Sequence, residues 1–292
     1  MNEHPRDIWS WWLLHRRFGG DIEQMKAAMT QLYQIRDRVL AYANLKSHDV
    51  LLDVGCGDGL IGFGALQRLD TVQVIFSDIS DDLLERVQEI AQEMGVLNRS
   101  RFIHAAAENL HPLADASVDV VTTRSVLIYV KAKQQAFHEF YRVLKPDGRI
   151  SLFEPINRFS YPEPPDVFWG YDVAAVMAIA QKIKSAYRRL QPPDDDPMLD
   201  FDERDLVTFA ERAGFRGIQL TLEIVVQPKA TWMTWDALVQ TAPNPRVPSL
   251  DEMMQAVLSP AEREQFIAHL KPLVEAHQGV TRSAVAYLRA WK

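Results

Sequence analysis

The stretch LLDVGCGDGLIG, residues 51–62, decides the fold of this chain. Its apolar start predicts a short buried strand that ends near Asp53, and four glycines follow at close spacing. The residues from 60 to 69 have the apolar pattern of a helix. A strand, a glycine-rich turn and the N-terminus of a helix together make a ligand site at the carboxyl end of a parallel sheet.

The charges around the glycines indicate which ligand the turn accepts. Gly57, Gly59 and Gly62 match G-x-G-x-x-G, a spacing that taken alone suggests a dinucleotide. The helix dipole favours a pyrophosphate here, but Asp53 and Asp58 would repel it. No lysine follows the glycines as it does in nucleoside triphosphate loops. A ligand that carries an ammonium group, a sulfonium and a ribose therefore fits better.

Asp78 supports a ribose in this site. It ends the second predicted strand, at 72–78, about two dozen residues after Asp53. An acid in that place of a strand–helix–strand unit accepts hydrogen bonds from both ribose hydroxyls. The alternative role, capping the next helix, is better suited to Ser80, and Gly95 ends that helix.

Strand-like and helix-like segments alternate along the middle of the chain. We expect further strands at 101–106, 118–123 and 149–155, with KPDG (145–148) as a turn before the last of them. Alternation of this kind predicts an α/β fold with a parallel sheet and helices on both faces. Further along, Asp202 caps a helix over 203–213 that Gly214 closes, and strands follow at 217–227 and 281–291.

We therefore divide the chain into four segments. They are an N-terminal helical cap (1–47), a ligand-binding core (48–155), a helical lid insertion between proline clusters (156–200) and the completion of the core (201–292), which contains a helical insertion at about 230–277.

Composition limits the function classes. The 292 residues are 47% hydrophobic and 24% charged, which is ordinary for a globular protein, and the net charge of −7 argues against a nucleic-acid partner. No apolar run approaches the roughly 20 residues that span a bilayer. The single cysteine, Cys56, excludes an internal disulfide and fits the cytoplasm. Inside the loop it has no visible base beside it, so we interpret it as a small filler.

At this point the sequence resembles a known family, the class I S-adenosylmethionine-dependent methyltransferases of the small-molecule type. The residues that carry the resemblance are LLDVGCGDG (51–59), FSDIS (76–80), AAAENLHPLADASVDVVTTRSVLIYV (105–130) and AFHEFYRVLKPDGRISLFEP (136–155). The resemblance implies a Rossmann-like, doubly wound, mostly parallel seven-stranded sheet with N-terminal helices and helical insertions. It also implies S-adenosyl-L-methionine as the cofactor. Asp194, Asp195 and Asp196 could suggest a metal, but no His or Glu lies at ligand spacing, so we expect none.

The resemblance implies roles for particular residues along the cofactor. Asp53, Gly55 and Gly57 would contact the methionine end, Asp78 and Ile79 would bracket the ribose and adenine, Ala107 and Glu108 would lie beside the adenine, and Arg124 would lie under the methionine moiety. One departure is that this chain has Ala105, Ala106, Ala107 and Glu108 where relatives often have Gly-Asp-Ala-Glu. The acid that takes the adenine amino group is missing, and a backbone carbonyl or Glu108 would replace it.

The other candidates lie around the expected acceptor side. Tyr33 would close over the cofactor, or it packs on the surface. Tyr129, after the fourth strand, and Glu154, at the end of the fifth, would act near the methyl group, Glu154 by orienting or deprotonating the substrate. His15, with Arg16 and Arg17 beside it, would bind an acidic acceptor. Each of them also has a purely structural interpretation.

The sequence thus predicts a methyltransferase that moves a methyl group to O, N or C of a small apolar or aromatic metabolite. Two alternatives keep the cofactor: a non-methylating enzyme, such as a cyclase, and a regulatory or scaffold subunit. A nicotinamide-dependent dehydrogenase is a distant further alternative. We expect a cytoplasmic protein without a membrane or nucleic-acid partner, and the helical additions leave a homodimer open.

Overall fold

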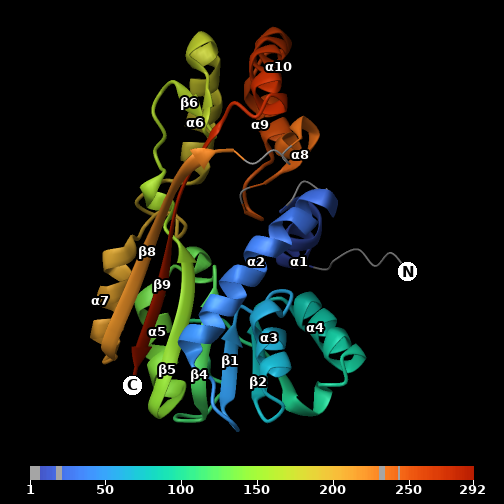
Figure 1. Ribbon diagram of the computed structural model, residues 1–292. Coiled ribbons are helices and arrows are strands. Elements are labelled where there is room, and N and C mark those ends of the chain that lie inside the picture. The colour runs from blue at the N-terminus through green and yellow to red at the C-terminus, as the bar shows by residue number, and fades with distance from the viewer. Residues whose placement is uncertain (1–6, 18–21, 230–233, 243) are drawn as a thin grey trace. The chain divides into compact units, whose positions relative to one another are not determined.

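The computed structural model of the protein describes residues 7–17, 22–229, 234–242 and 244–292 (Figure 1). The described residues form two compact units. The core unit comprises Gln31–Ile156, Asp200–Glu223 and Val285–Lys292, and the helical unit comprises the described residues of Met1–Thr30, Asn157–Leu199 and Ile224–Ala284.

Three elements continue from one unit into the other: α2 (Ile22–Ala43), β8 (Arg216–Pro228) and β9 (Val280–Trp291). The division at Thr30 falls inside α2, whose helical period runs on to Ala43. This continuity is why the sequence pattern places the end of the N-terminal cap at residue 47.

A seven-stranded sheet organises the core unit (Figure 1). Its further strands are β1 (Val50–Val54), β2 (Gln73–Asp78), β3 (Ser100–His104), β4 (Val118–Arg124) and β5 (Leu144–Pro155). The strand order is β3-β2-β1-β4-β5-β9-β8, with β1 to β5 pairing in parallel and β9 antiparallel to β5. The predicted Rossmann-like, mostly parallel sheet is confirmed.

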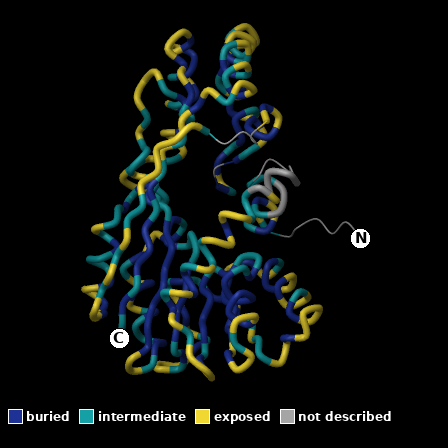
Figure 2. The backbone as a smooth tube through the Cα atoms, in the orientation of Figure 1, coloured by how far each residue is buried: buried dark blue, intermediate teal, exposed yellow. Residues whose placement is uncertain are grey.

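Helices cover this sheet. They are α3 (Leu60–Arg68), α4 (Asp81–Glu93), α5 (Lys133–Val143) and α7 (Glu203–Ala213), with short turns η2 (Leu97–Arg99) and η3 (Leu127–Tyr129). Helices α2, α3 and α4 share one apolar cluster with the strands, and α5 packs on α7 through Phe137 and Phe209, whose ring centroids are 5.9 Å apart. The inner strands β1, β2, β4 and β5 are deeply buried, whereas the edge strand β8 is largely exposed (Figure 2).

The predicted helix ends are confirmed where capping residues set them. The Leu83 amide donates to the Ser80 hydroxyl at 3.1 Å at the start of α4. Asp202 and Asp205 form a reciprocal capping box on α7, and Gly214 closes that helix with φ of +99°. Such caps satisfy amides that the first helical turn leaves without partners, so they fix the ends strongly.

One predicted element boundary is wrong. The expected turn at 145–148 lies within β5, because Leu144 already pairs with Val118 before the register shifts near Val120. Asp147 has φ of +63°, so the backbone turns sharply there, and the pairing with β4 resumes at Arg149 opposite Val120.

The helical unit has its own apolar core. Its elements are α1 (Ile8–Trp11), η1 (Trp12–Arg16), η4 (Asn157–Phe159), β6 (Val167–Phe168), β7 (Tyr171–Asp172), η5 (Ala174–Val176), α6 (Met177–Leu190), α8 (Trp235–Gln240), α9 (Leu250–Val257) and α10 (Pro260–Glu275). Buried residues of α6, α8, α9 and α10 form one cluster with those of the β6–β7 hairpin. Trp12 is buried and its indole N–H donates to the Ala242 carbonyl at 3.0 Å, so this tryptophan anchors the N-terminal helix. Within the described part of the chain, no helix is both long and apolar enough to cross a bilayer.

Candidate functional site

The glycine loop between β1 and α3 is a tight cradle. Gly55 and Gly59 have φ of +60° and +78°, values that strain any residue with a side chain. A Cβ atom at Gly55 would lie 2.5 Å from Val126 Cγ2, and one at Gly59 would lie 2.5 Å from the Phe63 ring. Both positions therefore require glycine.

Asp53 stabilises this loop through hydrogen bonds of its buried carboxylate. Its carboxylate accepts the Gly62 amide at 3.0 Å and the Thr122 hydroxyl at 3.2 Å, so it joins the first turn of α3 to β4. Burial raises the pKa of Asp53 to about 7, although the hydrogen bonds from Gly62 and Thr122 and the charge of Arg124 act to lower it. Its expected contact with the methionine end of the cofactor stays a prediction.

Asp78 joins the loop to the end of β2. One carboxylate oxygen accepts the Gly57 amide at 2.9 Å, and the other accepts the Ser80 amide at 3.0 Å. These two bonds fix the Asp78 carboxylate between the glycine loop and the start of α4. Ile79, the next residue, is 46% exposed, and its expected contact with the ribose and adenine stays a prediction.

The segment after β3 lies beside Asp78, because β2 and β3 pair in parallel with Asp78 opposite His104. Ala107 is buried and Glu108 is half-buried in this segment. The structure thus brings the predicted adenine residues to the same sheet edge as the predicted ribose acceptor, while their contacts with a cofactor stay predictions.

Arg124 ends β4 and lies near an acid of the glycine loop. Its Nη2 is 3.7 Å from Asp58 Oδ1, and its side chain is 10% exposed. The sequence argument treats Asp58 as a charge that repels phosphate and misses this cation opposite it. No spacing rule links the two residues, since they come together only through the parallel pairing of β1 with β4.

Cys56 lies inside the glycine loop, near three carboxylates. Burial raises the pKa of its thiol well above the usual value, and the carboxylates Asp78, Asp53 and Asp58 raise it further. The thiol therefore stays protonated, which agrees with a filler and not a nucleophile. The same three carboxylates give the loop interior a negative field.

Glu154, at the end of β5, is only 1% exposed. Its Oε1 accepts the Thr123 hydroxyl at 2.8 Å and the Val126 amide at 3.1 Å. Burial raises the pKa of Glu154 to about 7 against the effect of these hydrogen bonds. Sequence reasoning missed the two neighbouring threonines of β4: Thr122 donates to Asp53 and Thr123 to Glu154. The TT doublet at a strand end is the signal that could have found them.

For the remaining candidates, Tyr129, Tyr33 and His15, the structure gives few contacts that bear on their expected roles. Tyr129 is half-buried in η3, and its amide donates to the Val126 carbonyl at 2.9 Å. Tyr33 is 44% exposed, with the Arg36 guanidinium 4.6 Å from its ring centroid. The side chain of His15 lies outside the residues that the structure describes. The roles expected for these three residues stay predictions.

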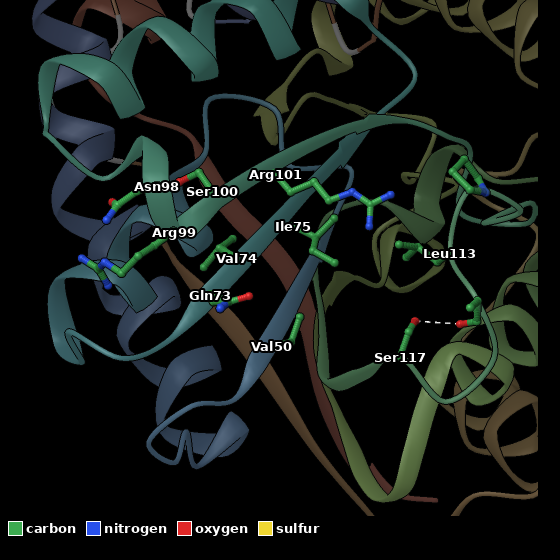
Figure 3. Close-up of a pocket in the computed structure, with 12 residues that line it drawn as sticks. Val50, Gln73, Val74, Ile75, Asn98, Arg99, Ser100, Arg101, Leu113 and Ser117 are labelled. Atoms are coloured by element: carbon green, nitrogen blue, oxygen red, sulfur yellow. Dashed lines mark hydrogen bonds between the residues drawn. The ribbon is translucent and has the colours of Figure 1, made fainter.

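A cavity of about 420 Å³ lies elsewhere in the core unit (Figure 3). Val50, Gln73 and Ser100, the first residues of β1, β2 and β3, line it together with Arg101 and Leu113. It is therefore at the amino ends of the strands, whereas the glycine loop follows their carboxyl ends. It contains none of the predicted site residues.

The strand order, the glycine loop and the acid ending β2 define a class I S-adenosylmethionine-dependent methyltransferase core. Residues 52–152 match the family model described as "Methyltransferase domain". The chain therefore carries a domain of this family, and the resemblance read from its motifs is confirmed.

Individual relatives match only part of the chain. It is 31% identical over 135 residues to the tRNA 5-carboxymethoxyuridine methyltransferase of Escherichia coli (strain K12), covering 46% of this chain and 50% of that protein. It is 32% identical over 135 residues to the ubiquinone/menaquinone biosynthesis C-methyltransferase UbiE of Marinomonas sp. (strain MWYL1), covering 46% and 51%. The chain thus spans about half the length of these curated relatives.

A solved structure extends the likeness in fold over most of the chain. A geranyl diphosphate methyltransferase in complex with S-adenosylmethionine matches with a TM-score of 0.53 and 17% identity, covering 93% of this chain and 91% of the other. At this identity the likeness concerns the fold alone.

Proposed function

We propose that the protein is an S-adenosylmethionine-dependent methyltransferase that moves a methyl group to O, N or C of a small apolar or aromatic metabolite. The observation that carries the proposal is the glycine loop with Asp78 bonded to it through the Gly57 amide. When bound, the cofactor supplies an electrophilic methyl group on a sulfonium sulfur.

The residues present fit this cofactor better than a dinucleotide. Gly55 and Gly59 hold the loop backbone in conformations that only glycine adopts without strain, and Asp78 is bonded to the loop through the Gly57 amide. Burial raises the pKa of the Cys56 thiol inside the loop, and the carboxylates Asp78, Asp53 and Asp58 act in the same direction. The negative charge of these carboxylates favours an ammonium and a sulfonium and disfavours a pyrophosphate.

The chain's own task in the reaction is alignment. Methyl transfer is an in-line displacement, so most of the rate comes from holding the acceptor atom, the methyl carbon and the sulfur in one line without water between them. The glycine loop and Asp78 would hold the cofactor end of that line. A base is needed only for an acceptor that is protonated at the working pH.

The acceptor is the finer part of the proposal. One relative is named for a modified uridine in tRNA and another for a quinone pathway, so relatedness supports the cofactor and not one acceptor. The net charge of −7 favours a small molecule over tRNA. The single cysteine, free and buried, fits a reducing compartment such as the cytoplasm.

Two measurements test the proposal. Calorimetry should detect binding of S-adenosylhomocysteine, and incubation with methyl-labelled S-adenosylmethionine should transfer label to a component of a metabolite extract but not to tRNA. Asp78→Ala should abolish both signals, and Asp195→Ala, in an exposed stretch, should change neither. Binding without any transfer would favour the non-methylating or scaffold alternative, and the absence of binding would refute the proposal.

A further inference from the structure

Glu154 occupies an unusual environment for a carboxyl group. It is 1% exposed, and its Oε2 has no hydrogen-bond partner of good geometry among the residues that the structure describes, although the backbone amides of Leu127 and Ile128 act with that of Val126 to lower its pKa. Leaving a buried polar atom without a partner costs stability, and native proteins keep few such atoms. The presence of a glutamate here therefore calls for a benefit that its other oxygen provides.

That other oxygen holds the segment after β4. Glu154 Oε1 accepts both the Thr123 hydroxyl and the Val126 amide. This one atom therefore joins the end of β4 and the segment that follows it to the end of β5. The Ser125 amide donates to the Phe153 carbonyl at 2.8 Å, and Ser125 has φ of +59°. The backbone thus turns away from the strand in a conformation that few residues adopt without support.

The segment after β4, which Glu154 holds, packs against the glycine loop through Val126. The side chain of Val126 fills the space that a side chain at Gly55 would need, with Val126 Cγ2 only 2.5 Å from the position of that absent Cβ. Because protein interiors are close-packed, a shift of Val126 must change the room available to the loop. A continuous path of contacts therefore leads from Glu154 through Val126 to Gly55.

We propose that Glu154 is a positioning residue for the cofactor, which acts by holding Val126 against Gly55 and does not touch the acceptor or the cofactor itself. The proposal rests on the proposed function, since it presumes that the glycine loop holds the cofactor. It replaces the expectation that Glu154 deprotonates the substrate, because both contacts of Oε1 are internal and the side chain is enclosed.

The test measures the affinity for S-adenosylhomocysteine by calorimetry. Glu154→Leu keeps an apolar filling but removes the acceptor, and we expect a dissociation constant about 10-fold higher or more. Glu154→Gln keeps an oxygen in the place of Oε1, so its affinity and turnover should stay within about 3-fold of the original. An unchanged affinity of the leucine variant overturns the proposal. So does a glutamine variant that binds normally but has lost about 100-fold in turnover, as expected of a missing base.

Asp119→Leu is the matched control. The Asp119 carboxylate also accepts a backbone amide of a neighbouring strand, that of Val50 at 2.9 Å, but at the amino end of the sheet. This variant should lower the melting temperature and leave the affinity unchanged. A loss of affinity as large as that of Glu154→Leu would show that general loosening is the cause and would overturn the proposal.

A second variant covers the case in which Glu154→Leu does not fold. Val126→Ala leaves the backbone bond to Glu154 in place but removes the methyl groups against Gly55, and it should weaken binding by roughly 5-fold. In the double variant Glu154→Leu with Val126→Ala, the losses of affinity should not add, because both substitutions act through the same contacts. Additive losses, or none from Val126→Ala, would contradict the path. If the unaltered protein gives no heat with S-adenosylhomocysteine, the proposed function itself fails.

Discussion

Buried carboxylates have different partners at the two ends of the central sheet. At the amino end, just before β1, Asp49 lies 2.5 Å from Arg149 Nη2, and both side chains are buried. At the carboxyl end of the same strand, Asp53 is equally buried, and its carboxylate accepts the Gly62 amide and the Thr122 hydroxyl, with the charge of Arg124 also acting on it. Glu154 likewise accepts a hydroxyl and backbone amides.

The difference separates stability from function. In a buried ion pair with further hydrogen bonds, each charge has a partner. A buried carboxylate that is not part of an ion pair lowers the free energy of unfolding when it ionises. Proteins tolerate such costs mainly where a ligand is bound. The amino end is thus built to be stable, and the carboxyl end keeps buried carboxyl groups beside the glycine loop at a cost in stability.

The largest effect is expected from closing the cradle at the carboxyl end. Gly55→Val combines a positive φ with a collision against Val126, so it should abolish the rise in melting temperature that S-adenosylhomocysteine causes. Gly95→Ala is the control, because Gly95 also has a positive φ of +69° but nothing within 4 Å of its absent Cβ. It should cost only about 1 kcal/mol of stability and keep the rise. A preserved rise in Gly55→Val would refute this view of the loop.

Breaking the ion pair at the amino end should give the next largest effect. Asp49→Asn leaves the buried Arg149 guanidinium without its counter-charge, and we expect a loss of about 3 kcal/mol in the free energy of unfolding. Denaturant titration measures this loss. The affinity for S-adenosylhomocysteine should not change, and a parallel loss of affinity would mean that the two ends are not independent.

The pH dependence of stability should reveal the unpaired carboxyls. The pKa values of Asp53 and Glu154 are raised to about 7, while in the unfolded chain they ionise near pH 4. Between these values the folded protein holds more protons, so the free energy of unfolding should fall as the pH rises from about 4 to 7. Glu154→Gln should remove up to roughly 3 kcal/mol of this fall. Denaturant titrations at both pH values check it, and an unchanged slope would contradict the burial argument.

The smallest effect should come from the exposed acid of the loop. Asp58 is 42% exposed and 3.7 Å from Arg124, so solvent and salt weaken its influence. Asp58→Asn should weaken the binding of S-adenosylhomocysteine by less than about 3-fold at physiological salt. Calorimetry at two salt concentrations measures this, and a 10-fold loss would place Asp58 in direct contact with the cofactor.

Much of the fold and part of the site follow from local sequence. Ser80, Asp202 and Gly214 set helix ends through contacts with residues next to them, and the glycine loop is one continuous stretch. The partners of the buried acids are not local. Thr122 reaches Asp53 and Thr123 reaches Glu154 only because β4 lies between β1 and β5, an order that no spacing reveals.

Two other features also escape the sequence pattern. The β6–β7 hairpin has strands of two residues each, which are too short to show an alternating period. The division of α2 between the two units depends on what each turn contacts, and the helical period is the same on both sides of it.

The place of β9 in the sheet has a consequence for folding kinetics. Glu154 pairs through its backbone with Ala286, far later in the sequence, and β9 stands between β5 and the edge strand β8. Closing so long a loop carries a large entropic cost, so this pairing should be among the slow steps of folding. A refolding chain would then complete β1 to β4 early and gain its ligand affinity only when β9 docks.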